Sequence, residues 1–189
     1  RHLTGKLTKH AILKKFLYES STLTSLISHD IISLFGKAKE HKEIFLLSSF
    51  RKMGMNILAL NFQESYVKLL SSFERGEDEL IKLENRELSL NHIQVGVSVM
   101  KQWAMPEIFI NTIQNQDFPQ ASFRKVNEID RVTRIAEILC KMLMNIKITG
   151  EEGNILYEAN LYYQPRKEFS VLFGEEYYAN IKSHPFFEL

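Results

Sequence analysis

Hydrophobic residues recur at intervals of three and four along most of the chain, which is the spacing of helices that bury one face. This pattern predicts a long helix from Lys9 to Phe35, with Gly36 as its stop. Between Lys42 and Leu60 apolar residues fall on nearly every side, so we expect one central, surrounded helix there. A third helix is predicted over Gln63–Phe73, closed by Gly76.

The same spacing continues through the second half of the chain. The acidic segment Glu77–Glu87 predicts a short, exposed helix, and Lys125–Met144 predicts a long one. We expect interruptions at Asp117-Phe118-Pro119, in a loop over Thr149–Gly153, at Gln164-Pro165 and at Gly174. No segment alternates strictly enough for a sheet. The sequence therefore predicts an all-α fold, a compact bundle of about eight or nine helices.

Residues 84–113 carry the most specific local pattern, a helix, a tight break and a second helix. One face of the first helix holds His92, Gly96, Val99, Met100 and Trp103. Gly96 leaves room for another backbone to approach closely. We expect Trp103 to be a core residue whose truncation to alanine costs about 3–5 kcal/mol. Ala104-Met105-Pro106 forms the break, with Pro106 at the first position of the second helix.

His92 allows two interpretations. A histidine on the inward face of a helix is expected to be buried and hydrogen-bonded to a backbone carbonyl or to a carboxylate. Glu84 and Glu87 are the carboxylates nearest in sequence. The alternative is a role in binding a ligand.

Composition and charge narrow the classes of function. The 189 residues suit a single domain spanning 1–189, with 44% apolar and 25% charged residues. A net charge of +1 provides no field for nucleic acid or an anionic membrane. The basic segment Arg1–Lys15 is interpreted as a solvated helix start or linker. Cys140 is the only cysteine, which favours a reducing, cytoplasmic compartment. No apolar run approaches the ~20 residues that a membrane span needs.

Familiar catalytic and metal-binding motifs are missing from the sequence. It contains no GxxxxGK[ST], GxGxxG, HExxH, CxxC or GxSxG pattern. His29-Asp30 is the only adjacent His-Asp pair among six histidines, and neighbouring helical residues point about 100° apart. We therefore expect an exposed polar face at His29 and no metal, cofactor or activated nucleophile in the chain.

One stretch resembles the signature of HDOD domains, bacterial output modules related to the HD phosphohydrolases. The resemblance rests on Glu84, His92, Gly96, Trp103, Met105-Pro106 and Ile113. It extends more loosely to Ile44–Gly54, similar to the family's central helix, and to Leu17–Thr24. The similar region covers roughly residues 12–145, and the family's N-terminal helical half is expected to be missing or truncated.

The resemblance also indicates which positions hold metal in the active HD enzymes. The first-helix histidine falls on Glu19, the central His-Asp on Arg51-Lys52, and a His-His pair on Gln116-Asp117. Two cations in place of ligands would repel a metal, so the resemblance implies that phosphohydrolysis is lost. We expect these five residues to form a salt-bridge and hydrogen-bond cluster in a vestigial pocket. The alternative is that Arg51 or Lys52 points to solvent, where an ion pair is worth ~0–1 kcal/mol.

The resemblance implies a non-catalytic signalling or regulatory module that contacts protein partners. Candidate contact regions are the acidic run Glu74–Glu87, the basic run Arg1–Lys15 and the aromatic residues Tyr162, Tyr163, Tyr177, Tyr178, Phe186 and Phe187. A second hypothesis is a sensor that binds a nucleotide or cyclic dinucleotide in the vestigial pocket, with arginine as phosphate ligand. A third is residual enzyme activity with a relocated metal.

Overall fold

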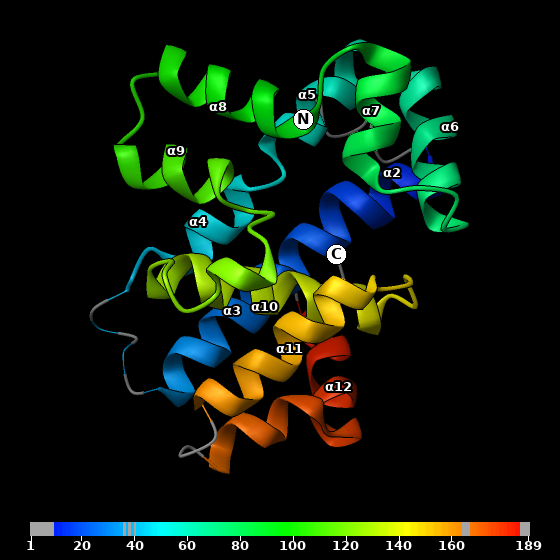
Figure 1. Ribbon diagram of the computed structural model, residues 1–189. Coiled ribbons are helices and arrows are strands. Elements are labelled where there is room, and N and C mark those ends of the chain that lie inside the picture. The colour runs from blue at the N-terminus through cyan, green and yellow to red at the C-terminus, as the bar shows by residue number, and fades with distance from the viewer. Residues whose placement is uncertain (1–9, 36, 38, 40, 164–166, 186–189) are drawn as a thin grey trace. The chain divides into compact units, whose positions relative to one another are not determined.

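The computed structural model describes residues 10–35, 37, 39, 41–163 and 167–185, and these form helices and connecting turns without any strand (Figure 1). The predicted all-α fold is therefore confirmed. The chain divides into two compact units, which are described separately below. The first contains Arg1–Ser21 and Ser49–Asn115, and the second contains Thr22–Ser48 and Gln116–Leu189. No helix within the described ranges is long and apolar enough to cross a membrane.

The first unit is built from short helices that pack against one another. Its elements are α2 (Ala11–Leu13), the π-helical η1 (Lys14–Glu19), α5 (Met53–Asn61), α6 (Gln63–Glu74), α7 (Leu80–Leu88), α8 (His92–Gln102) and α9 (Glu107–Gln114). Figure 1 shows α8 and α9 side by side, joined by a tight turn. The core is formed by side chains from every helix, among them Leu13, Phe16, Met55, Leu58, Leu70, Leu83, Met100 and Ile113.

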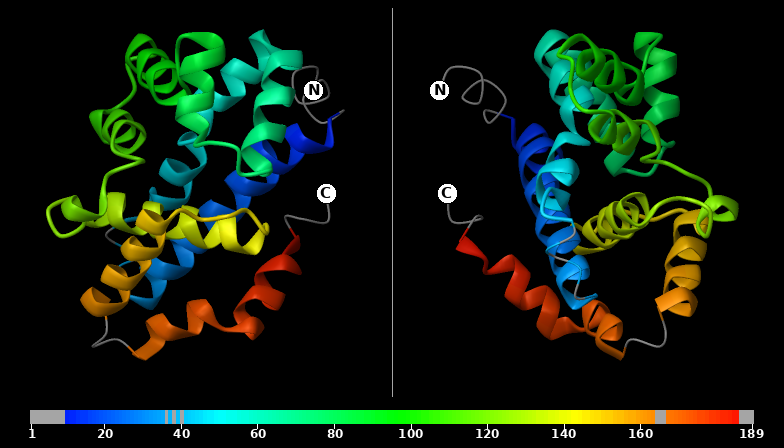
Figure 2. Two further views of the ribbon diagram at one scale, coloured as in Figure 1. Left: turned by 45° about the vertical axis from the view of Figure 1, so that its right-hand side comes forward. Right: turned by 90° about the vertical axis from the view of Figure 1, so that its left-hand side faces the viewer.

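The second unit is organised around α10 (Glu128–Leu143), in which every residue from Ile129 to Cys140 is buried. Its other elements are most of α3 (Ser20–Leu34), most of α4 (Ile44–Phe50), the 3-10 helices η2 (Gln120–Ser122) and η3 (Lys167–Phe173), α11 (Gly150–Tyr163) and α12 (Glu175–Lys182). Figures 1 and 2 show α10 lying between α3 and α11. Phe35 stacks on Tyr163 with their ring centroids 4.3 Å apart.

The predicted single helix over Lys42–Leu60 is wrong. It is two helices, α4 and α5, separated by a turn at Arg51-Lys52. Lys52 has φ −85° and ψ 2°, which interrupts the α-helical backbone. Neither glycine nor proline marks this turn, so the pattern alone did not show it. Leu46 is 49% exposed, so α4 is not surrounded on all sides.

The predicted loop over Thr149–Gly153 is also wrong, because α11 begins at Gly150. The Thr149 hydroxyl accepts from the backbone N–H of Glu152 (3.1 Å), and the Glu152 carboxylate accepts from the N–H of Thr149 (2.9 Å). This is the reciprocal capping box of a T-x-x-E sequence. The predicted start of the preceding long helix at Lys125 is three residues too early, since α10 begins at Glu128 and Asn127 caps it. Gly36 and Gln164-Pro165 lie outside the described residues.

Candidate functional site

The first unit holds a close contact between two helix backbones at paired glycines. A Cβ atom added to Gly54 of α5 would lie 1.8 Å from the carbonyl oxygen of His92 on α8. One added to Gly96 would lie 3.1 Å from Ile113 Cγ2 and 3.5 Å from the backbone nitrogen of Gly54. The predicted backbone approach at Gly96 is therefore confirmed, and it fixes where α8 starts relative to α5.

A buried carboxylate lies beside this crossing and connects three helices. Glu84 of α7 is 0% exposed. Its Oε1 accepts a 2.5 Å hydrogen bond from the Tyr66 hydroxyl of α6, and its Oε2 accepts a 3.0 Å bond from the backbone N–H of His92. Nδ1 of His92 lies 2.6 Å from the same Oε2. The predicted buried histidine on a carboxylate is confirmed. The predicted exposure of the acidic helix is wrong at Glu84.

Glu84, Tyr66 and His92 form a structural anchor, in which both carboxylate oxygens of Glu84 accept hydrogen bonds. Burial, followed by the charge of Glu84 and the hydrogen bond to it, raises the pKa of Tyr66 well above its ordinary value. The phenol therefore stays protonated and continues to donate to Glu84. The carboxylate also lies at the N-terminus of α8, where the helix dipole favours negative charge.

Local sequence explains why α8 starts at His92. Asn91 caps the helix by accepting from the N–H of Gln94 (3.0 Å), and the Gln94 side chain accepts from the N–H of Asn91 (3.0 Å). The Asn91 amide also donates to the side chain of Asn85 on α7 (3.1 Å). These bonds fix the turn between α7 and α8 and so place His92 over Glu84.

The other end of α8 corrects two predictions. Trp103 is 55% exposed, so its assignment to the core is wrong. The helix α8 ends at Gln102, and Trp103 is its C-cap residue. The helical spacing that predicted an inward side chain for Trp103 therefore does not hold at this position. Pro106 caps α9, whose first residue is Glu107, one position later than predicted.

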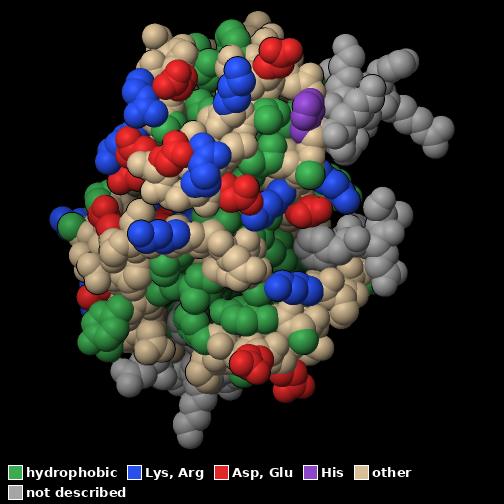
Figure 3. All heavy atoms as spheres, turned by 90° about the vertical axis from the view of Figure 1, so that its right-hand side faces the viewer, with side chains coloured by type: hydrophobic (Ala, Val, Ile, Leu, Met, Phe, Trp, Pro, Cys, Tyr) green, Lys and Arg blue, Asp and Glu red, His purple; other side chains and the backbone are tan. Residues whose placement is uncertain are grey.

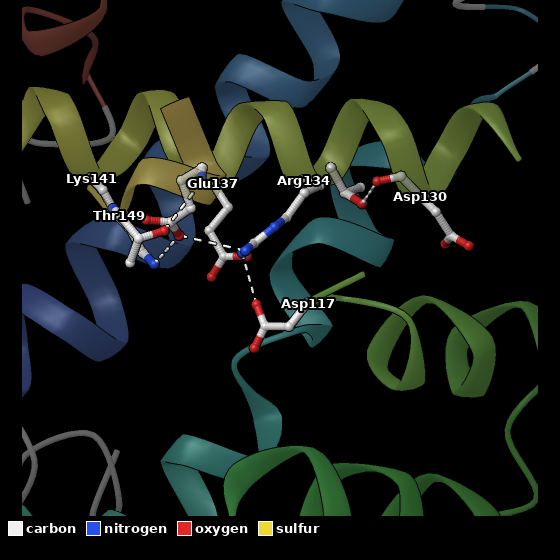
Figure 4. Close-up of polar contacts among 8 residues, drawn as sticks. Asp117, Asp130, Arg134, Glu137, Lys141 and Thr149 are labelled. Carbon is white, nitrogen blue, oxygen red and sulfur yellow. Dashed lines mark hydrogen bonds and ion pairs between the residues drawn. The ribbon is translucent and has the colours of Figure 1, made fainter. Parts of the chain in front are cut away.

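The second unit contains a network of ion pairs centred on Arg134 of α10 (Figure 4). Its Nη1 atom lies 2.7 Å from Asp117 Oδ1 and 3.5 Å from Glu137 Oε2, and its Nη2 atom lies 3.5 Å from Glu152 Oε1. Lys141 contacts the same Glu152 oxygen at 2.5 Å. The Arg134 and Glu152 side chains are 8% and 4% exposed. The network therefore ties α10 to the start of α11 and to the turn that carries Asp117.

Electrostatics keeps this network charged. Burial lowers the pKa of the Arg134 guanidinium, but Asp117, Glu137 and Glu152 together raise it above its usual value. Arg131, on the same helix, donates to the carbonyl oxygens of Phe123 and Val126 and lies 4.9 Å from the centre of the Tyr162 ring. Burial raises the pKa of Tyr163 to about 12, although its hydrogen bond to Arg131 opposes this rise.

The predicted vestigial-pocket residues are distributed between the two units. Glu19 is half-exposed and pairs with Lys14 at 3.6 Å. Arg51 is 1% exposed, so the alternative in which it points to solvent is wrong, and Lys52 is half-buried. In the second unit Gln116 is 2% exposed, whereas Asp117 reaches Arg134. A cluster that joins all five residues stays a prediction.

Sequence reasoning missed the residues of the Arg134 network that pair with Asp117 and with one another. Arg134, Glu137, Lys141 and Glu152 were not singled out, although the T-x-x-E sequence of residues 149–152 was a readable signal for Glu152. His29 lies 3.9 Å from Asp30 with more than half of its side chain exposed, as expected for a polar face. Across the described residues, no three or more His, Cys, Asp or Glu side chains are grouped so that they could hold a metal ion.

Comparison with known families gives one match. The HDOD domain model matches residues 2–119, which include the Glu84–His92 anchor and the paired glycines. The chain therefore belongs to the HDOD domain family, an HD-related family associated with signalling. Comparison with curated proteins and with solved structures gives no significant match.

Proposed function

We propose that this chain is a non-catalytic regulatory module of bacterial signal transduction, and that it works by binding protein partners. Membership of the HDOD family supports a signalling role. The contacts of the two carboxylates described above support structural roles for these side chains. Glu84 is enclosed by its donors, and Asp117 forms an ion pair with Arg134, so neither carboxylate is directed at a substrate.

The observation that carries the proposal is the outer face of α11. Tyr157, Leu161 and Tyr162 are 64%, 39% and 40% exposed, and the first two are four residues apart on one side of the helix. Its inner side is apolar as well, with Ile155, Leu156 and Ala159 buried. Exposed aromatic and aliphatic side chains grouped on one helix are typical of protein interfaces.

Several side-chain contacts support this face from beneath. The Arg131 guanidinium lies under the Tyr162 ring, and Tyr162 also packs edge-on against Phe123 with centroids 5.9 Å apart. Arg124 donates to Glu158 through two nitrogen atoms at 3.3 Å each. A surface that is already ordered loses less entropy on binding. The face is thus suited to recognition without a conformational change.

The other contact regions expected from the sequence are weaker candidates. Exposed acids of the run Glu74–Glu87 lie within ion-pair distance of nearby bases, as Glu77 does with Arg75 (2.6 Å) and Glu79 with Lys82 (3.2 Å). Figure 3 shows charges of both signs interspersed over one face. Tyr163 is 4% exposed, while Phe186, Phe187 and the first nine residues lie outside the described residues.

The test compares a pair of substitutions on α11 with a control pair on α6. A partner is identified by cross-linking in the native bacterium, purified, and titrated by calorimetry against Tyr157→Ala/Leu161→Ala and against the control Ser65→Ala/Lys68→Ala, two exposed positions of α6. We expect the first pair to weaken binding at least tenfold and the second to leave it unchanged. Equal binding by all variants contradicts the proposal. A large thermal shift with a nucleotide or cyclic dinucleotide, and no protein partner, favours the sensor instead.

A further inference from the structure

The helix α12 is only lightly anchored in the second unit. Ile181 is its one buried residue, Tyr177 and Tyr178 are half-buried, and the other five of its eight residues are exposed. By contrast, α10 buries every residue from Ile129 to Cys140. Elements with few buried apolar side chains open locally at a lower free energy than the core does. The burial pattern therefore places α12 among the parts of the unit that open most easily.

The surroundings of α12 point the same way. Figure 2 shows η3 and α12 at the edge of the second unit in both views. Within the described part of the chain, α12 packs mainly against η3, which directly precedes it. Its N-cap residue is Gly174, which has no side chain to cap the helix. A helix of this length is marginal in water by itself, so α12 needs its contacts with the rest of the unit to stay helical.

One hydrogen bond joins a side chain of α12 to another helix. The Tyr177 hydroxyl donates to Oδ2 of Asp30 on α3 at 3.1 Å. Burial, followed by the charge of Asp30 and the hydrogen bond to it, raises the pKa of Tyr177 above its ordinary value. The phenol therefore stays protonated and able to donate at neutral pH. The contact connects two segments that lie 147 residues apart in the sequence.

We propose that α12 is a latch, which opens from the second unit as a separate element and is held closed by the hydrogen bond between Tyr177 and Asp30. Opening frees the carboxylate of Asp30 and exposes the covered side of α12, formed by Tyr177, Tyr178 and Ile181. A change between order and disorder in one segment is a recurring form of molecular switch. A partner that binds only the open form shifts the two populations toward it. The latch does not use the outer face of α11, so either proposal can fail without the other.

Amide hydrogen exchange, followed by mass spectrometry of the unmodified chain, tests whether α12 opens separately. We expect peptides from α12 to exchange about tenfold faster than peptides from α10 or more, because exchange in α10 requires the core of the unit to unfold. Equal rates in the two helices overturn the proposal, since α12 then opens only together with the core.

Substitutions test the hydrogen bond itself. Tyr177→Phe removes the donor and Asp30→Ala removes the acceptor, so each should speed exchange in α12 by about fivefold or more and leave α10 unchanged. The double variant should exchange no faster than the faster single variant, because both changes break the same bond. Tyr178→Phe, at a half-buried position of the same helix, is the matched control and should leave the rate in α12 unchanged.

Two results of these substitutions overturn the latch. The first is an unchanged rate of exchange in α12 after Tyr177→Phe, which means that the hydrogen bond does not hold the helix. The second is an increase in exchange that reaches α10 to the same extent as α12. In that case the bond supports the whole unit and not one helix.

Discussion

The α-carbon of Gly54 lies so close to the carbonyl of His92 that a single added methyl group would come within 1.8 Å of the carbonyl oxygen. Both atoms of this contact belong to backbone, so neither can move aside as a flexible side chain would. The contact sets the crossing of α5 and α8, and it brings the start of α8 over the buried carboxylate of Glu84.

Alanine substitutions at three glycines should rank by the space around each. Gly54→Ala should lower the free energy of unfolding by on the order of 3 kcal/mol or more, or prevent folding, because the added methyl group overpacks the contact. Gly96→Ala should cost about 1–2 kcal/mol, because Ile113 Cγ2 at 3.1 Å can partly yield. Gly153→Ala on α11 meets nothing and should stabilise by roughly 0.5–1 kcal/mol. Urea unfolding measures all three, and equal effects would contradict the assigned contact.

The Glu84 anchor predicts a coupled loss of stability. Glu84→Gln places an amide N–H₂ against a donor, either Tyr66 or His92, and should cost about 1–3 kcal/mol. Tyr66→Phe removes one donor to the carboxylate and should cost a similar amount. The double variant should cost less than the sum of the two, because both changes disrupt one hydrogen bond. Glu87→Gln, three residues away with its side chain 56% exposed, is the control and should stay within about 0.5 kcal/mol.

The Arg134 network predicts an asymmetry between its members. Arg134→Met removes the guanidinium that the buried carboxylates of Glu137 and Glu152 share, and should cost about 3–5 kcal/mol. Asp117→Asn should cost about 1 kcal/mol or less, since its side chain is 34% exposed. A double-mutant cycle of these two changes by chemical unfolding should give a non-zero coupling energy. Strict additivity would show that the 2.7 Å contact does not form in solution.

The strained turn between α8 and α9 predicts a stabilising substitution. Ala104→Gly removes the Cβ atom from a residue with φ 51° and should raise the free energy of unfolding by about 0.5–1 kcal/mol. Asn145 ends α10 in the same conformation, φ 55°, but asparagine tolerates it. Asn145→Gly should therefore change the free energy of unfolding by only a few tenths of the gain expected for Ala104→Gly. A loss of stability in Ala104→Gly by thermal unfolding would argue against the assigned backbone conformation.

The sequence predicted those features that depend on local spacing. Helical periodicity identified α6, α8 and α9, and the small residue at Gly96 correctly indicated a backbone contact. The position of His92 on the same face correctly indicated a buried hydrogen bond to a carboxylate. Each of these inferences used residues within one helix or its immediate neighbour.

The failures have identifiable physical causes. The turn at Arg51-Lys52 contains no helix-breaking residue, so tertiary packing overrode a continuous apolar pattern. The two glycines in residues 149–153 led to the prediction of a loop, although Thr149 and Glu152 form a capping box that starts a helix. Trp103 was placed inside because the helix was extended one residue too far. Arg134 gathers partners up to 18 residues away, and no single helix pattern predicts such a meeting.

The most direct test of the central claim is an elemental analysis of the purified chain after incubation with Mn, Fe, Ni and Zn salts and removal of unbound ions. The resemblance to the HD enzymes implies that Glu19, Arg51, Lys52, Gln116 and Asp117 replace their metal ligands, and on that hypothesis the account predicts far less than one metal ion per chain. It also predicts the same result for Asp117→Ala. One stoichiometric ion in the unmodified chain, lost in Asp117→Ala, would contradict the account.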